Sequence, residues 1–519
     1  MGLTTSYQLQ SHLGIITDFP PEAVPPTSWT DCRNVTFGEG SSSRSPGWSR
    51  YAATNMPPDK EPIFAGSVGF DGINYWIWMT EDEVWVTNGS DHYNITPTGG
   101  LIPCSPGEWT YDVLSGIPVF NNGNNPPMWW NLEPGTPAEV LPGWPADAVC
   151  KSLRAVKYHL VALNITQAGV NYPGQVWWSA AAQAGAIPQE WLPTAENDAG
   201  DTILGDSPGA IVDGWTLRDQ LVIYKNSSTY TMQYVAGQYV YAFRKLFPTI
   251  GAQGLNCVCE LDATHYVFTG EDVIRHDGQN VQSLIDRKVK KKFIASVDGT
   301  RLQLCCIAAR VVERQIWVCI PFQGDDYLSV ALCINTDDGE IGLILLPNVS
   351  SVVRGTINPA GAVEQEIWEG DDNSWESDNT IWTQTTFSPT NDSIMMTQTG
   401  ANLLQAVGIG DSADGAAVSA SLSRLSMRVG EGIYHSVITQ VAPMFEGVNG
   451  DVVRIRMGQQ DYFNQPITWK PYQDFIIGQT RGVDEIIDGR YVSLQFDIQT
   501  PNAWKMQGYY LKTKEAGEY

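Results

Sequence analysis

The sequence predicts an all-β protein built around a β-propeller, with a second β domain towards its C-terminal end. Its 49 Gly, 31 Pro and 19 Trp in 519 residues suit half-buried strands joined by short turns. Strand-like runs alternate with turn signals about every 8–12 residues. These runs gather into clusters of three or four strands that recur at intervals of roughly 40–55 residues, a period typical of propeller blades.

Residues 1–60 are rich in Pro, Ser, Gly and Asn and show no lasting periodicity. The Pro pairs at 20–21 and 25–26 exclude a helix there, because each Pro biases its predecessor away from helical geometry. We expect this segment to be an extended N-terminal arm that gains order by packing on another domain or subunit.

Residues 61–360 contain six strand clusters and therefore predict a six-bladed β-propeller. A row of β-sandwiches is the alternative. The hairpins join neighbouring strands in chain order with few long crossovers, which favours blades over Greek keys. No WD or kelch signature is present, so the prediction rests on strand spacing alone.

Residues 361–400 read as an acidic linker or closing segment, with carboxylates at Glu366, Glu369, Asp371, Asp372, Glu376 and Asp378. The stretches 371–375 and 377–382 are similar to the Ser/Asp/Gly/Trp turn of sialidase-type propellers, but they lack the Gly and do not recur in other blades. We interpret them as a solvated acidic loop, on which a Ca²⁺ ion is an alternative hypothesis.

Residues 401–519 predict a further β domain. In the run 491–496, Val492, Leu494 and Phe496 alternate with Tyr491, Ser493 and Gln495. This period-two pattern indicates a half-buried antiparallel strand, so we expect a β-sandwich-like fold for this domain.

The balance of 31 Lys+Arg against 57 Asp+Glu gives a formal net charge of −26. This charge excludes binding of nucleic acid by phosphate neutralisation, which needs clustered basic side chains. It is explained either by a solvated surface or by a wall that repels passing DNA. The one basic run holds Arg287, Lys288, Lys290, Lys291 and Lys292. A phosphate-binding patch and a Lys-protected strand edge are alternatives there, and we favour a salt-bridged contact to an acidic neighbouring subunit.

No secretory signal or membrane span is recognisable in the sequence. The nine scattered Cys lack zinc-site spacing and predict buried free thiols of a protein made in a reducing cytoplasm. The six His show no metal-ligand spacing, and G-x-S-x-G, H-E-x-x-H, Walker and dinucleotide-binding motifs are missing. We therefore expect no enzyme activity, no cofactor and no metal. A glycosidase that uses two carboxylates remains an alternative.

Two stretches resemble a known family. The first runs from Asp18 through an acidic Pro-Pro segment to Trp29, Asp31, Asn34, Val35 and Phe37, and then to Pro46-Gly47-Trp48. The second lies between 213 and 293, and its marks are Leu217-Arg218-Asp219, Tyr224-Lys225, Asp272, His276-Asp277-Gly278, Ser283, Ile285 and Asp286. Both resemble the tail nozzle family of short-tailed bacteriophages, also called tail tubular protein B.

The resemblance implies a structural virion protein without catalytic residues. Six copies would form a ring around the channel through which the double-stranded genome leaves, without sequence-specific binding. The expected partners are other copies of the chain, a tail adaptor protein, and tail fibres or adhesion proteins, with host-surface contact possible in principle. The expected location is the virion tail, assembled in the bacterial cytoplasm. A receptor- or glycan-binding propeller, or a carbohydrate-active tail enzyme, is the alternative.

Overall fold

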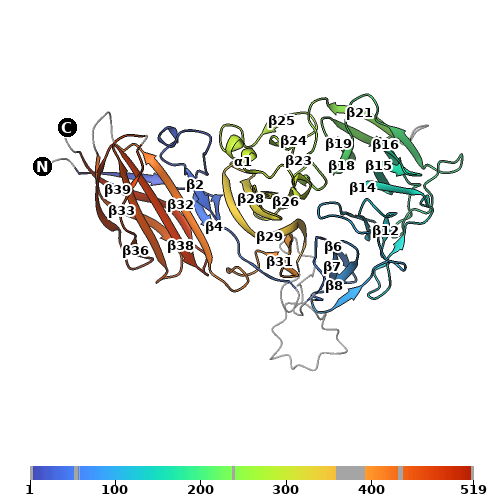
Figure 1. Cartoon of the computed structure of the whole chain (residues 1–519), viewed down its shortest axis with the longest axis horizontal. Helices are drawn as coiled ribbons and strands as arrows, with labels where there is room; N and C mark the ends of the chain where they lie inside the picture. The colour runs from blue at the N-terminus through green and yellow to red at the C-terminus, as the bar shows by residue number, and fades with distance from the viewer. Residues whose placement is uncertain are drawn as a thin grey trace, which may run out of the picture.

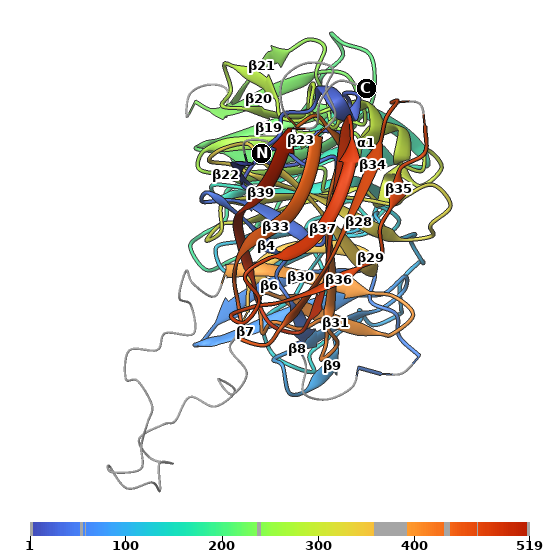
Figure 2. The same cartoon turned by 90° about the vertical axis from the view of Figure 1, so that its left-hand side faces the viewer.

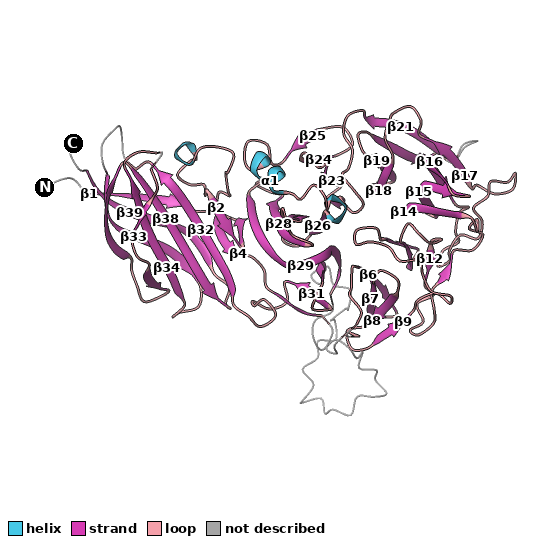
Figure 3. Cartoon of the chain, in the orientation of Figure 1, coloured by secondary structure: helices cyan, strands magenta, loops and turns pink. Residues whose placement is uncertain are grey.

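The computed structural model describes residues 4–51, 56–57, 59–235, 240–357, 392–429, 436–463 and 465–515. The described chain is almost entirely strand (Figure 3) and forms two β domains placed along the longest axis, a propeller and a sandwich (Figure 1). The all-β prediction is confirmed. No helix in these ranges is long and apolar enough to cross a membrane.

Five blades of the propeller are separate four-stranded antiparallel sheets in chain order. They comprise β6 (Phe64–Phe70), β7 (Ile73–Met79), β8 (Val84–Thr87) and β9 (His92–Asn94); β10 (Thr110–Leu114), β11 (Ile117–Asn121), β12 (Met128–Trp129) and β13 (Glu139–Val140); β14 (Ala148–Val156), β15 (His159–Gln167), β16 (Val170–Trp178) and β17 (Gly200–Ile203); β18 (Ile211–Leu217), β19 (Gln220–Lys225), β20 (Thr229–Tyr234) and β21 (Tyr241–Phe247); and β22 (Val258–Leu261), β23 (Thr264–Phe268), β24 (Val273–His276) and β25 (Val281–Ser283).

Two further blades belong to a 13-stranded sheet. The sixth blade is β26 (Cys306–Arg310), β27 (Gln315–Ile320), β28 (Leu328–Asn335) and the first half of β29 (Ile341–Thr356). The seventh is the second half of β29 with β30 (Asp392–Gln398), β31 (Leu403–Val407) and β5 (Trp48–Arg50).

The β-propeller prediction is therefore confirmed, while the described strands form seven blades where six were expected. The seventh blade is composite, because its outermost strand comes from residues 48–50 and its two middle strands from residues 392–407. This arrangement closes the ring of blades with strands from both sides of the propeller sequence. Of the predicted acidic linker, 361–400, residues 361–391 lie outside the described residues, and Asp392–Gln398 is a blade strand.

The sandwich packs two sheets face to face, as predicted for the C-terminal domain (Figure 2). One sheet contains β1 (Thr4–Gln10), β4 (Ser41–Arg44), β39 (Lys505–Glu515), β33 (Ser436–Glu446) and β37 (Val483–Gly489). The other contains β2 (Asp31–Arg33), β32 (Val418–Met427), β38 (Tyr491–Thr500), β34 (Val452–Gln460), β35 (Thr468–Trp469) and β36 (Gln473–Ile476).

The N-terminal arm extends along both domains as paired strands. Its strand β1 pairs with the last strand, β39, while β3 (Val35–Gly38) lies between β29 of the propeller and β4. Asn34 forms this junction: its backbone N–H donates to the carbonyl of Leu343 at 2.7 Å, and its side-chain oxygen accepts from the N–H of Leu345 at 2.8 Å. Its Nδ2 donates to the carbonyl of Ser419 in the sandwich at 2.7 Å. The two domains are thus joined by backbone and side-chain hydrogen bonds.

The hydrophobic core is also continuous across the junction. One cluster of buried side chains includes Val318 of blade six, Leu494 of the sandwich, and Trp29 and Phe37 of the N-terminal arm. Trp29 is 2 % exposed, lies edge-on to Phe496 with ring centroids 5.9 Å apart, and donates its indole N–H to the carbonyl of Ser11. Each Å² of apolar surface that is buried at the junction contributes about 25 cal/mol of stability. We therefore treat the two domains as one rigid body.

Candidate functional site

The axis of the propeller holds a cavity of about 370 Å³, lined by residues from the innermost strand of every blade. These strands are β6, β10, β14, β18, β22, β26 and the second half of β29. An opening at the blade axis is the place where propellers most often hold ligands, so this cavity is the first candidate for a functional site.

Arg154 of β14 lines the cavity and is fixed by the buried Asp213 of β18. The Nε donates to Oδ1 at 2.8 Å and Nη2 to Oδ2 at 2.6 Å, and both side chains are at most 2 % exposed. Nη1 of Arg154 donates to the carbonyl of Tyr111 at 3.0 Å, and the guanidinium lies 4.7 Å from the ring centroid of Trp215. The carboxylate of Asp213 also accepts from the hydroxyl of Ser152 at 2.7 Å and from backbone N–H groups.

Three other charged residues line the cavity, Glu260, Arg354 and Asp392, and Asp112 lies near Arg154. Asp112 accepts from the N–H of Ala155 at 2.8 Å, and burial raises the pKa of its carboxyl while Arg154 nearby lowers it. Arg354 donates from Nε and Nη2 to the carboxylate of Asp392 at 2.9 and 2.6 Å. Arg154 and Arg354 thus each pair with a carboxylate, and the Arg154–Asp213 pair ties blades three and four together.

Arg154, Asp213 and Trp215 were not predicted as site residues, although Asp213 begins one of the stretches that carries the family resemblance. A charged residue between apolar neighbours, as in Ile211-Val212-Asp213-Gly214-Trp215, was the available signal. Because Asp213 and Arg154 are 59 residues apart in the chain, strand patterns alone do not pair them.

Two of the described histidines belong to a buried hydrogen-bonded cluster around Tyr224. His265 and His276 oppose each other on β23 and β24, and both contact the hydroxyl of Tyr224, at 2.7 Å from Nδ1 and 2.6 Å from Nε2 respectively. Burial lowers the pKa of His265 to about 3 and that of His276 to about 4, so both are neutral at physiological pH. His435 lies outside the described residues. Within the described ranges, no group of three His, Cys, Asp or Glu side chains could hold a metal ion.

All nine cysteines are buried free thiols, as the sequence predicts. Burial raises the pKa of those for which a shift is resolved, including Cys32, Cys150 and Cys257. A protonated, inaccessible thiol is a poor nucleophile, so these side chains serve packing.

The last three Lys of the basic run begin a helix, α1 (Lys290–Ser296), and Arg287 and Lys288 lie in the turn before it, so the run is not the strand edge that was one alternative. Val289 and Phe293 are buried one turn apart, which is the helical spacing. Lys290 pairs with Asp272 at 2.6 Å and Lys288 with Glu340 at 3.4 Å, so part of the basic charge is neutralised within the chain. The predicted contact of this run with a neighbouring acidic subunit stays a prediction.

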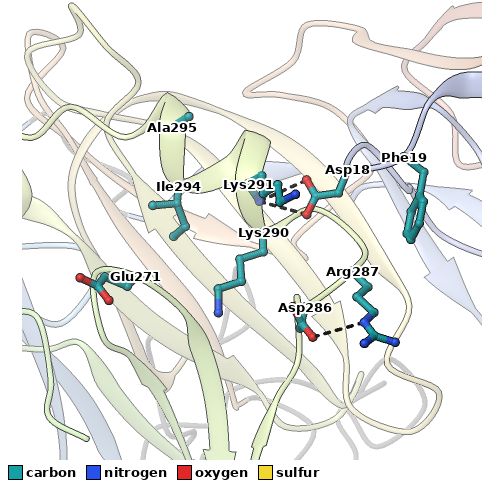
Figure 4. Close-up of a pocket in the computed structure, with 9 residues that line it drawn as sticks. All are labelled: Asp18, Phe19, Glu271, Asp286, Arg287, Lys290, Lys291, Ile294 and Ala295. Carbon is teal, nitrogen blue, oxygen red and sulfur yellow. Dashed lines mark hydrogen bonds and ion pairs between the residues drawn. The ribbon is translucent and has the colours of Figure 1, made fainter. Parts of the chain in front are cut away.

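A groove of about 610 Å³ lies between α1 and the N-terminal arm (Figure 4). The carboxylate of Asp18 accepts from the backbone N–H groups of Lys291 and Lys292 at 3.0–3.2 Å and so caps the helix. Phe19 and Arg287 stand exposed at the same groove, and Arg287 is 4.0 Å from the carboxylate of Asp286. This cap fastens the arm to the propeller beside the domain junction.

Comparison with known proteins finds no matching family model and no matching curated protein. Among solved structures, the chain is similar to the WD40 β-propeller domain of Doa1, with 9 % identity and a TM-score of 0.39 over 70 % of this chain and 97 % of that one. It is also similar to BBS1N in complex with ARL6DN, with 11 % identity and a TM-score of 0.37 over 70 % and 96 %. An exo-β-1,3-galactanase from Phanerochaete chrysosporium matches with 8 % identity and a TM-score of 0.30 over 90 % and 100 %. At these scores the likenesses carry no argument about activity.

Proposed function

We propose that this chain is a structural protein of a short bacteriophage tail, and that it forms a ring-shaped nozzle around the DNA ejection channel. The observation that carries the proposal is the position of the residues on which the family resemblance rests. Trp29, Asn34, Val35 and Phe37 build the junction between the two domains. A subunit of a rigid assembly needs its two domains held in a fixed position, and these residues join the two domains.

The Pro46-Gly47-Trp48 motif closes the propeller. The N–H of Trp48 donates to the carbonyl of Ser412 at 2.9 Å, and the carbonyl of Gly47 accepts from Gly408 at 2.8 Å. A Cβ at position 47 would lie only 2.6 Å from the carbonyl oxygen of Ser412, so this close approach of two backbone segments requires glycine. The structure therefore gives this motif a role in closing the propeller, and that role requires no catalytic activity.

The size of the axial cavity supports a channel formed between copies and not within one propeller. A cavity of about 370 Å³ has no room for a double helix, whose major groove alone is about 12 Å wide. In the proposed ring, each copy contributes one wall of the channel, and its propeller axis stays closed.

The charge suits such a wall. Six copies at −26 would carry a formal charge of −156, and DNA would slide past without counterion-release binding. Only carboxylates within a Debye length of about 8 Å of the DNA act on it at physiological salt. The proposed partners are further copies of the chain, the tail adaptor, and the fibres or adhesion proteins. Virion assembly in the bacterial cytoplasm agrees with nine reduced, buried thiols.

Light scattering of the purified protein across a range of concentrations, with negative-stain images of the same sample, tests this proposal. We expect a species of about six times 57.1 kDa that appears as a ring with a central hole. A monomer at every concentration, combined with binding or hydrolysis of a bacterial surface glycan, would overturn it in favour of the carbohydrate-directed alternative.

A further inference from the structure

The negative charge is distributed very unevenly along the chain. Residues 61–400 hold 39 acidic and 17 basic side chains, a net charge of −22, while residues 401–519 hold 13 acidic and 10 basic side chains, a net charge of −3. Two acidic propellers would repel each other in a ring. A contact between the nearly neutral sandwich of one copy and the propeller of the next avoids that repulsion.

The sandwich carries a partly exposed cluster of aromatic and Arg side chains, which we call the sandwich rim: Arg428, Tyr462, Phe463, Arg490 and Tyr491. Tyr462 and Phe463 are 57 % and 44 % exposed. The guanidinium of Arg428 lies 5.6 Å from the ring centroid of Tyr491, and that of Arg490 lies 5.7 Å from that of Tyr462. Phe463 and Tyr491 contact each other at 6.4 Å between centroids. Exposed Tyr, Phe and Arg are the residues most enriched in protein interfaces.

The outer part of blade three has the complementary character, and we call it the blade-three rim. Its exposed apolar side chains are Val170, Tyr172, Leu192 and Ile203, and the last two are each 62 % exposed. Between Lys157 and Arg218 the sequence has no basic residue, and the acidic residues are Glu190, Glu196, Asp198, Asp201, Asp206 and the buried Asp213. The surface thus offers apolar contacts within an unbroken acidic stretch, to which two Arg and two exposed aromatic rings are suited.

The two rims lie at opposite ends of the molecule. The sandwich strands β34 and β38 are at one end of the longest axis, and β15, β16 and β17 of blade three are at the other (Figures 1 and 3). Because the domains are one rigid body, the two rims of one copy cannot meet each other. Complementary patches at the two ends of a rigid unit are the arrangement that a head-to-tail, heterologous contact requires.

We infer that the sandwich rim of one copy docks on the blade-three rim of a second copy of the same chain. The Arg side chains of the sandwich rim lie against carboxylates such as Asp201, and Tyr462 and Phe463 cover the exposed apolar side chains of blade three. Repeated around a ring, this contact is the one that closes the nozzle, so the inference rests on the proposed function for its biological meaning. Its geometry can be tested separately.

The test uses the burial of all nine native cysteines, which leaves introduced surface cysteines as the reactive thiols. Gln465→Cys places a thiol beside the sandwich rim, and Ala195→Cys places one beside the blade-three rim, both at exposed positions. Each variant is treated with a short bis-maleimide alone and in an equal mixture, and the products are separated by denaturing electrophoresis. We expect a cross-linked dimer in the mixture and none in either variant alone.

The outcomes separate the interface from the ring. Cross-linking within a single variant would show a symmetric contact and overturn the head-to-tail assignment. A hexameric mass by light scattering and rings in negative-stain images, without cross-links in the mixture, would overturn the interface and leave the nozzle proposal intact. Cross-links in the mixture with only open chains or dimers would support the interface and overturn the nozzle.

Charge reversal gives an independent measurement. The double variant Arg428→Glu, Arg490→Glu should weaken self-association about tenfold or more, as loss of interface hot spots does. Arg481→Glu, an exposed reversal on the same domain but outside the rim, is the matched control and should leave self-association unchanged. Equal effects of the two reversals would show that only net charge matters and would overturn the assignment.

Discussion

Arg154 and Asp213 join two neighbouring blades through a pair of parallel hydrogen bonds of 2.8 and 2.6 Å at the axis of the propeller. A buried ion pair is costly to desolvate, and its neighbours here satisfy the remaining hydrogen-bonding capacity of both groups. The pair therefore links the two blades, and its removal should lower the free energy of unfolding of the propeller.

Replacing Asp213 with Asn should lower the free energy of unfolding by about 3–5 kcal/mol, because it leaves the charge of Arg154 buried without its partner. Urea unfolding followed by Trp fluorescence measures the change. Asp337→Asn is the matched control: Asp337 pairs with Arg314 at 2.5 Å, but its side chain is 58 % exposed, and we expect no measurable effect. A loss below 1 kcal/mol for Asp213→Asn would show that the pair does not link the blades.

Asn34 should be the most sensitive residue of the domain junction. It has a φ of +53° and makes two side-chain hydrogen bonds, one to each domain. Asn34→Ala should cost about 3 kcal/mol, because two partly buried hydrogen bonds are lost and a Cβ residue without a polar side chain must hold the left-handed conformation. Asn34→Gly loses the same hydrogen bonds without that strain, and we expect it to be more stable than Asn34→Ala by about 1 kcal/mol. Equal stability of both variants and the wild type would exclude a fastening role.

Stability should fall as the pH is lowered from 6.5 towards 4. Burial lowers the pKa of His265 to about 3 and that of His276 to about 4, below the ordinary value of 6.5, so the unfolded chain binds protons in this range that the folded chain does not. Each such proton removes about 1.4 kcal/mol of stability per pH unit. Urea unfolding at pH 7, 6, 5 and 4 should show this slope, and His276→Gln should reduce it by about half. An unchanged slope in the variant would assign the acid sensitivity to other groups.

The nine cysteine thiols should be unreactive in the native protein. All nine are buried, so a thiol-specific disulfide reagent should react with none of them within minutes under native conditions and with all nine in guanidinium chloride. Rapid reaction of even one thiol in the native state would contradict the packing around it. It would also remove the basis for the cross-linking test.

The sequence predicted the architecture well where the information was local. Val492, Leu494 and Phe496 are each fully buried in β38, as their alternation indicates. Ser493 was expected on the outward face with Tyr491 and Gln495, but it is buried because its hydroxyl accepts from the N–H of Ser426 at 2.9 Å. The strands β32 and β38 shift register between Arg424 and Met427, and such an irregularity is invisible to a period-two pattern.

The parts that were missed depend on residues far apart in the chain. The seventh blade combines residues 48–50 with 349–356, 392–398 and 403–407, so no local repeat in the sequence predicts it. The helix α1 was not predicted, because the seven-residue segment is dominated by Lys and its helical spacing is carried only by the buried Val289 and Phe293. The axial pair of Arg154 and Asp213 could be found only once the blades were in place around the axis.

A three-dimensional reconstruction of the assembled particle by electron microscopy tests the proposed nozzle. We expect a ring of copies whose central channel runs between them, with the axis of each propeller closed and with the sandwich of one copy against blade three of the next. A channel that runs through the axis of a single propeller, or a particle without a central channel, would contradict it.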